Sequence, residues 1–253
     1  MTEARIYQLL LYGFFVLGAL TVPGLVFLTA PYGRHAKEGW GPKVTSRIGW
    51  ILMEGPATLL IAACFFIAPH SPSPVAWFFL VMWEIHYVNR AFIFPFKMRG
   101  GDKPMPLVIA FFGLTFQLIN GYLNGRGLTL FGPQYTLAWL YDPRFLVGTA
   151  MFFGGLLINR QSDRILFNLR KPGETGYKIP AGGFYRWVSC PNYFGEILEW
   201  SGFAVATWSP AGLAFAVWTA ANLVPRAFSH HKWYRETFPD YPRERRAILP
   251  LII

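Results

Sequence analysis

The apolar run at residues 48–68 reads IGWILMEGPATLLIAACFFIA, and its one charged side chain is that of Glu54. A helix of this length matches the hydrocarbon core of a bilayer, which is about 30 Å thick. Burying a charge at that depth costs at least ~2.5 kcal/mol on insertion scales, so such a residue is a functional candidate by default. The run therefore predicts a membrane-spanning helix that carries a candidate functional group.

Similar apolar runs lie on both sides of this one. The whole chain of 253 residues is 53% hydrophobic and 14% charged, whereas about a quarter of the residues in a soluble domain are charged. We predict an all-α fold, an integral membrane bundle of seven transmembrane helices in one domain over residues 1–253. The predicted spans are 7–29, 48–68, 74–94, 106–124, 145–159, 195–208 and 210–226.

Basic residues mark one side of this bundle. Of the 23 Lys and Arg residues, 20 fall in segments that seven spans would place on the same side, namely 30–47, 90–105, 159–194 and 226–253. Lys and Arg are retained in cytoplasmic loops, so we expect a cytoplasmic C-terminus and an N-terminus on the opposite side. The net charge of +10 is then explained without nucleic acid as a partner. We expect a multi-pass protein of a bacterial inner membrane or of the endoplasmic reticulum.

The sequence contains neither a metal-ligand spacing nor one of the common nucleotide-binding motifs. Cys64 and Cys190 make neither a disulfide framework nor a metal-ligand spacing. His230 and His231 are neighbours and would point to different faces of a helix, so no metal is expected. The chain has no GxGxxG motif after a strand and no GxxxxGK[ST] motif, so a bound dinucleotide would not be held by a Rossmann unit.

Polar residues also occur within the predicted third and sixth spans. Asn192, Glu196 and Glu199 share one helix face because they are spaced at i, i+4 and i+7. Such a face must point into the bundle and away from lipid. Polar groups in membrane helices often pair only to hold helices together, and this structural alternative stays open for Glu84 and Glu199.

Glu54 and Tyr87 are the two best hydrogen-bond donors of the apolar region. Glu54 has no basic neighbour within one helical turn, and a carboxyl group in apolar surroundings tends to stay neutral. A neutral carboxyl group and a phenol can both donate to a carbonyl oxygen on which negative charge develops during a reaction. These two residues are therefore our candidate catalytic groups.

Three polar clusters on the predicted cytoplasmic side could bind an anionic cofactor. They offer cations for phosphates, amides and carboxylates for ribose, and aromatic rings for a base. The residues alone thus predict an intramembrane site with a cytoplasmic, anion-binding mouth. The clusters cover residues 159–178, 191–196 and 226–234.

Several separated motifs, in order along the chain, resemble the steroid 5α-reductase family, with the type 2 enzymes nearest in pattern. They include Tyr32–His35, Glu54, His86 with Tyr87 and Arg90, Arg170–Glu174, residues 177–183, Asn192–Glu196 with Glu199 and Trp200, residues 226–234, Asp240–Pro242, and Leu249 with Pro250. The resemblance covers nearly the whole length and implies a seven-helix fold. It also implies NADPH-dependent reduction of the Δ4 double bond of a 3-oxo-steroid.

The same resemblance implies roles for individual residues. Glu54 and Tyr87 would be catalytic because they polarise the C3 carbonyl while hydride adds to C5 and an enolate forms. Trp50, Phe112 and Phe116 would bind substrate with them. The expected partners are a steroid-like enone and membrane lipid, and the protein is expected to be a monomer. The NADPH-binding residues would be Arg34 (in place of a family lysine), Arg99, Asn159, Asp163, Arg170, Tyr177, Asn192, Glu196, His230 and Tyr234.

Two departures from the family pattern bear on the substrate. Met53 replaces a polar residue beside the glutamate, and Phe112 stands where the type 2 enzymes have an arginine. The carbonyl chemistry survives both changes, but the substrate preference need not.

Two other functions remain as alternatives. Membrane methyltransferases of isoprenylcysteine or phospholipids are similar in their C-terminal half, but this chain has Ser189-Cys190-Pro191 where they carry Arg-His-Pro. They would also leave Glu54 and Tyr87 without a role. A non-enzymatic lipid-binding protein or channel would line a continuous path with polar residues, whereas here these residues gather in the cytoplasmic half.

Overall fold

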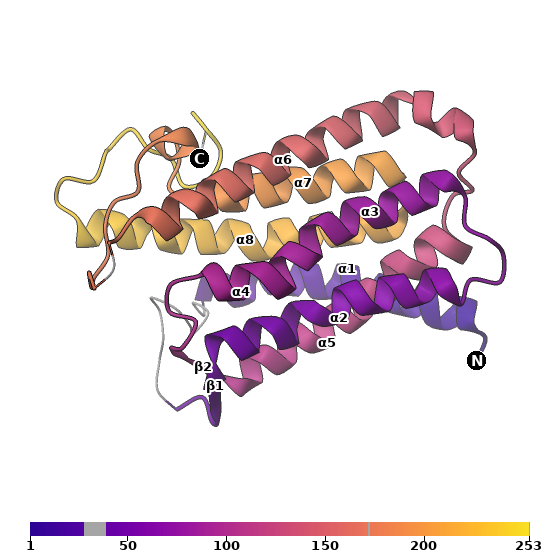
Figure 1. The fold of residues 1–253 in the computed structure, drawn as a ribbon, viewed down its shortest axis with the longest axis horizontal. Helices are drawn as coiled ribbons and strands as arrows, with labels where there is room; N and C mark the ends of the chain where they lie inside the picture. The colour runs from indigo at the N-terminus through magenta and orange to yellow at the C-terminus, as the bar shows by residue number, and fades with distance from the viewer. Residues whose placement is uncertain (28–38, 172, 253) are drawn as a thin grey trace.

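The computed structural model describes residues 1–27, 39–171 and 173–252, most of which are helical. Long helices run roughly side by side in a single bundle (Figure 1). π-helical segments continue α3 over Asn89–Ile93 and α5 over Gly127–Phe131. The α-helices are α1 (Glu3–Phe27), α2 (Ser46–Phe66), α3 (Pro74–Val88), α4 (Phe94–Lys97), α5 (Leu107–Arg126), α6 (Pro143–Asn168), α7 (Pro191–Thr207) and α8 (Pro210–Thr237).

Local sequence explains where several helices begin. Proline is the first residue of α3, α6, α7 and α8, where its fixed φ suits the helix and its missing N–H is not needed. The residues before three of these prolines cap the helix, because their side chains accept hydrogen bonds from the first turn. These caps are Ser73, Asp142 and Ser209.

A two-stranded antiparallel sheet sets α2 beside α5. Strand β1 (Lys43–Thr45) leads directly into α2, and strand β2 (Pro104–Pro106) leads directly into α5. Both helices therefore start at the same end of the bundle (Figure 1). At about 1.5 Å per residue, Glu54 and Gln117 lie about 12 and 15 Å along their helices, at nearly the same depth.

Glycines bring α6 and α7 into backbone contact. A Cβ atom on Gly155 would lie 2.3 Å from the backbone nitrogen of Glu199, and one on Gly195 would lie 2.6 Å from that of Asn159. Small residues allow this close approach between helices in membranes. The polar residues on these two helices are consequently held at short range.

The centre of the bundle is aromatic. Trp83, Phe79, Trp200, Phe203 and Phe152 are fully buried. Their rings meet mostly at tilted or edge-on angles, as between Trp83 and Trp200 with centroids 5.2 Å apart. Such arrangements are favoured over face-to-face stacking.

Among the described residues, three helices are long and apolar enough to cross a membrane: Glu3–Phe27, Ser46–Phe66 and Leu107–Phe131. Helix α1 exposes Leu9, Val16 and Leu20 on its surface, as expected for a helix that faces lipid. The mostly helical fold class is confirmed. The other predicted spans also lie on helices, but they do not meet the same length and hydropathy limits.

The ends of the helices agree with the predicted grouping of loops. The N-terminus, the α2–α3 turn and the start of α6 lie at one end of the bundle, and the sheet and the C-terminal segment lie at the other (Figure 1). Several helices extend beyond their predicted spans, among them α6, which reaches Asn168, and α8, which reaches Thr237. The fourth span was expected to end at residue 124, but its helix continues through Arg126 to Phe131. Arg126 is buried there, and it forms a bidentate ion pair with Glu3. Its Nε and Nη2 atoms lie 2.7 and 2.8 Å from Glu3 Oε1 and Oε2.

Candidate active site

A group of hydrogen-bonding side chains joins α2, α3 and α5, in which Tyr87, Gln117 and Asn120 are buried and Glu54 is half-buried. We call it the amide cluster, and it consists of Glu54, Tyr87, Gln117 and Asn120. Gln117 Nε2 donates to Glu54 Oε2 at 2.8 Å and lies 3.1 Å from the Tyr87 hydroxyl. Asn120 Nδ2 donates to Gln117 Oε1 at 3.1 Å. The cluster thus connects the two candidate catalytic groups through a single amide.

The surroundings of Tyr87 are apolar. Its side chain is 2% exposed and packs against the rings of Trp83 and Trp200, with centroids 4.8 and 5.5 Å away. Hydrogen bonds are stronger in such surroundings than in water, and an unpaired polar group is more costly. A carbonyl oxygen that reached Glu54 and Tyr87 would meet them away from bulk water.

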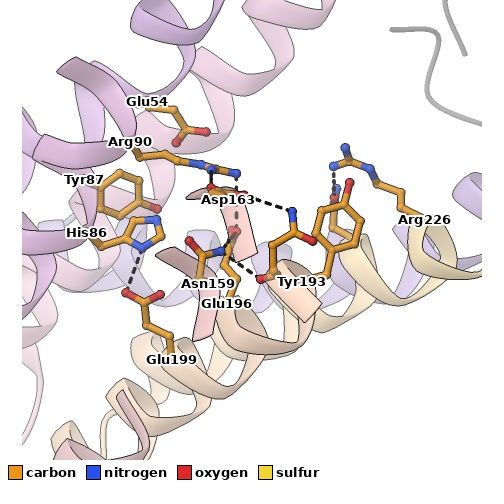
Figure 2. A network of polar contacts seen from close by, with 12 residues as sticks. Glu54, His86, Tyr87, Arg90, Asn159, Asp163, Tyr193, Glu196, Glu199 and Arg226 are labelled. Carbon is orange, nitrogen blue, oxygen red and sulfur yellow. Dashed lines mark hydrogen bonds and ion pairs between the residues drawn. The ribbon is translucent and has the colours of Figure 1, made fainter. Parts of the chain in front are cut away.

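A second group, which we call the charged cluster, lies where α6 and α7 meet the end of α3 (Figure 2). Arg90 pairs with Asp163 at 3.3 Å and with Glu196 at 3.6 Å. Asn159 Nδ2 donates to the backbone carbonyl of Asn192 at 2.9 Å, and Asn192 Nδ2 donates to Asp163 Oδ1 at 3.4 Å. The charged cluster therefore unites four of the predicted cofactor residues around one cation.

Arg90 links the charged cluster to the amide cluster. It is in the π-helical segment that follows α3, and its side chain is 13% exposed. Its guanidinium group contacts the rings of Trp50 and Phe94, at 4.8 and 4.4 Å from their centroids. It also interacts electrostatically with Glu54, which lies on the opposite side of it from Asp163 in Figure 2. Glu54 thus has no basic neighbour on its own helix, but it has one on the next.

Glu199 and His86 form a separate buried pair. His86 Nδ1 lies 2.9 Å from Glu199 Oε1, and the Glu199 side chain is 0% exposed. The pair ties α3 to α7 beside Tyr87. For Glu199, this contact favours the structural alternative, in which a polar pair holds two helices together. Glu84 is half-buried, and its Oε1 atom has no hydrogen-bond partner among the described residues.

The remaining predicted cofactor residues lie toward the end of the bundle that holds the C-terminus. Arg99 donates to the backbone carbonyl of Lys171 at 3.0 Å, next to Arg170. The guanidinium group of Arg170 is 6.0 Å from the centre of the Tyr177 ring.

Aromatic contacts extend this region to α8. Tyr177 contacts Trp233, which in turn contacts Tyr234, and the Tyr193 hydroxyl lies 3.1 Å from His230 Nε2. The predicted cofactor residue Arg34 lies outside the described residues.

The predicted substrate residues have different surroundings. Trp50 stacks on Arg90 at the edge of the charged cluster. Phe116 lies between α1 and α8, stacked on Phe14 at 5.1 Å and on Trp218 at 3.9 Å. Phe112 is 61% exposed, so it lies on the surface of α5 and not in the amide cluster. Binding of substrate by all three stays a prediction.

Sequence reasoning missed Gln117, Asn120 and Asn124. Each is buried on α5, and Asn124 Nδ2 donates to Asn120 Oδ1 at 2.9 Å. Their spacing of i, i+3 and i+7 in an apolar run puts them on one helix face. This spacing could have identified them, because polar side chains on one face of a membrane helix usually point into the bundle.

Titratable residues elsewhere do not suggest a metal centre. Within the described ranges, no three His, Cys, Asp or Glu side chains are grouped so that they could hold a metal ion. Cys64 and Cys190 are both buried free thiols.

The fold and the two clusters define a class: a helical, membrane-type enzyme whose polar site is enclosed among apolar helices. The family model described as 3-oxo-5-alpha-steroid 4-dehydrogenase matches residues 103–253. The chain therefore belongs to the steroid 5α-reductase family, and the expected enzyme class is confirmed.

Relatives from animals and plants resemble the chain over most of its length. It is 44% identical to bovine 3-oxo-5-alpha-steroid 4-dehydrogenase 1, over 94% of this chain and 93% of the relative. The corresponding human protein is 45% identical, over 87% and 85%. Steroid 5-alpha-reductase DET2 of Gossypium hirsutum is 38% identical, over 99% of both chains. Because these relatives carry type 1 and DET2 names, the likeness to type 2 enzymes stays a prediction.

Proposed function

We propose that this protein reduces the Δ4,5 double bond of 3-oxo-Δ4-steroids to give 5α-3-oxo-steroids, with NADPH as the reductant. The observation that carries this proposal is the amide cluster, in which Gln117 joins Glu54 to Tyr87 inside an apolar bundle. Family membership supports the reaction class, and it sets aside the methyltransferase alternative.

The amide cluster suits an enone because of where charge develops. When C5 of an enone accepts hydride, electrons move to the C3 oxygen and an enolate forms, and the ketone returns when C4 takes up a proton. Donors that are already in place stabilise that oxygen more strongly in the transition state than in the ground state. We assign this role to the Glu54 carboxyl and the Tyr87 phenol.

Glu54 can donate only when it carries a proton. The carboxyl groups of Glu54, Asp163 and Glu196 surround the single guanidinium group of Arg90, and neighbouring like charges oppose full ionisation. Asp163 and Glu196 pair with Arg90 directly, whereas Glu54 accepts a hydrogen bond from the neutral amide of Gln117. We therefore assign the proton to Glu54.

The charged cluster and its surroundings fit NADPH by the chemistry of their donors and acceptors. Asp163, Glu196, Asn159 and Asn192 offer carboxylates and amides for ribose hydroxyls and a carboxamide. Bound NADPH supplies the hydride. The cations at Arg99 and Arg170, whose side chains donate to the backbone carbonyls of Lys171 and Gly176 respectively, suit phosphate groups. We place the cofactor among these residues, with His230, Tyr177 and Tyr234 beside them.

The proposal also covers the membrane arrangement. We infer seven crossings with the charged cluster toward the cytoplasm, because 20 of the 23 basic residues fall on that side. The exposed apolar faces of α1, α2 and α5 support contact with lipid. Met53, which replaces a polar family residue, lies against Gly113 of α5 and so fills the interface between α2 and α5.

The test is turnover by purified protein in detergent with NADPH and a panel of 3-oxo-Δ4-steroids. NADPH oxidation should depend on the enone, and Glu54→Gln and Tyr87→Phe should each lower kcat by about 10²–10³. Thr115→Val is the matched control, because the Thr115 hydroxyl bonds only to the backbone carbonyl of Phe111 on the exposed side of α5. Normal turnover by both site variants would refute the assigned roles.

A further inference from the structure

The two N–H bonds of one amide group reach both candidate catalytic residues. Gln117 Nε2 lies 2.8 Å from Glu54 Oε2 and 3.1 Å from the Tyr87 hydroxyl oxygen. A primary amide nitrogen has two hydrogens, so it can donate to both acceptors at once. Gln117 itself is buried, as expected for a polar side chain whose bonds are made inside the protein.

We propose that Gln117 is a positioning residue that aims the acidic hydrogens of Glu54 and Tyr87 at a single substrate oxygen. By donating to Glu54 Oε2, it leaves Glu54 Oε1 to carry the carboxyl proton. By donating to the Tyr87 oxygen, it leaves the phenolic hydrogen free for a second acceptor. This inference rests on the proposed function, in which that acceptor is the C3 carbonyl.

Asn120 fixes which way the Gln117 amide points. Its Nδ2 atom donates to Gln117 Oε1 at 3.1 Å, so this oxygen must face Asn120 and the amide nitrogen must face Glu54. Asn120 is oriented in turn by Asn124, whose Nδ2 atom donates to Asn120 Oδ1 at 2.9 Å. The row of amides on α5 therefore sets the direction of each bond, and its last donor reaches the catalytic pair.

The Tyr87 hydroxyl has two possible arrangements around Gln117. It lies 3.2 Å from Gln117 Oε1, to which it could donate, and 3.1 Å from Gln117 Nε2, from which it can accept. The first arrangement uses the phenolic hydrogen within the protein. In the second, that hydrogen turns to a ketone, and Gln117 still satisfies the phenol oxygen. Gln117 thus allows Tyr87 to release its hydrogen without losing its partner.

The test replaces Gln117 with side chains of similar length. Gln117→Met removes both hydrogen bonds, and Gln117→Glu keeps an acceptor but loses the pair of N–H donors. Each should lower kcat by about 10- to 100-fold, and the KM for NADPH should stay within about twofold. Thr115→Val again serves as the control on the same helix.

A double-mutant cycle separates positioning from general structural damage. In a Tyr87→Phe background, Gln117→Met should lower kcat by a smaller factor than in the wild-type background, because one of the two groups that it orients is already absent. An equal fold loss in both backgrounds would overturn the inference, as would unchanged kcat in the two single variants. If Gln117→Met does not fold, the same double-mutant cycle with Gln117→Glu tests the positioning role.

The two proposals fail in different ways. If the wild-type protein oxidises no NADPH with any enone, the proposed function is wrong. If the wild-type protein turns over and the Gln117 variants match it, only the positioning role is wrong.

Discussion

The amide cluster and the charged cluster are neighbours, linked where Arg90 of the charged cluster interacts with Glu54 of the amide cluster, yet they differ in chemistry. The amide cluster consists of two amides, a phenol and one carboxyl group, all joined by hydrogen bonds. The charged cluster holds a guanidinium group against two carboxylates. An uncharged ketone needs donors in a dry site, whereas ribose and phosphate groups need acceptors and cations. This difference is why we propose that the amide cluster binds the ketone and the charged cluster binds the cofactor.

The two regions also differ in how their helices meet. Added Cβ atoms on Gly155 and Gly195 would strike the backbone of the facing helix. On α5, a Cβ atom on Gly113 would instead meet the side chain of Met53 at 2.5 Å. Backbone cannot move aside as a flexible methionine can. The α6–α7 frame of the charged cluster is thus the more rigid of the two.

The sharpest way to separate the clusters is Asp163→Asn, which keeps the shape of the side chain and removes its charge. Loss of a hydrogen bond to a charged group should raise the KM for NADPH about 10-fold or more, and the KM for the enone should change little. Steady-state kinetics with each substrate varied in turn measures both. Asp102→Asn is the control, because Asp102 is an exposed acid. If the KM for NADPH and the KM for the enone rose equally, the two clusters would not bind separate substrates.

The rigidity of the α6–α7 frame can be tested with three alanines. Gly155→Ala should destabilise the protein by about 1–3 kcal/mol, since the helices must separate to admit the methyl group. Gly154→Ala is its neighbour with nothing within 4 Å, and Gly113→Ala meets only the movable Met53 side chain. Thermal unfolding in detergent should rank Gly155→Ala far below the other two. Similar thermal midpoints for the three variants would show that the α6–α7 and α2–α5 interfaces tolerate an added methyl group equally well.

The smallest expected effect concerns the anchor of the C-terminal segment. His231 Nδ1 and the Tyr241 hydroxyl both lie 2.6 Å from the Ser189 hydroxyl. Partial burial lowers the pKa of the His231 imidazole, and the charges of Arg235 and Arg246 lower it further. The unfolded chain then binds this proton more readily than the folded protein, so stability is full above about pH 6.5 and declines below it.

Thermal midpoints at pH 7.5 and pH 5.5 measure this effect. The wild-type protein should lose about 2–4 °C more on acidification than His231→Gln, in which the titrating group is absent. If the thermal midpoint fell equally in both proteins, His231 would not be the cause of the loss of stability at low pH.

Much of the fold followed from the sequence. The runs at 48–68 and 106–124 predicted helices because their apolar length matches a bilayer, and both became long helices. The predicted grouping of the loops agrees with the ends at which the described helices start and finish (Figure 1), and their placement across a membrane stays a prediction. The face shared by Asn192 and Glu196 followed from helical spacing, and both residues contact Asn159 in the structure.

Other features could not be predicted from one helix at a time. Arg126 was expected in a loop, but its pairing with Glu3 keeps it in a buried helix. The approach of Arg90 to Glu54 depends on the π-helical segment after α3 and on how α3 packs beside α2. Periodicity gives the face of a side chain, but not the helix that it meets.

The sequence by itself determined the class of this protein and its candidate reactive groups: apolar runs long enough for a bilayer, a lone acid within one of them, and the motifs of a steroid-reducing family. Only the tertiary structure decided that Gln117 joins Glu54 to Tyr87, and that Arg90 forms ion pairs with acidic residues of both α6 and α7. The physical reason is that length and hydropathy act along a single helix, whereas a hydrogen bond between helices depends on their depth, rotation and distance.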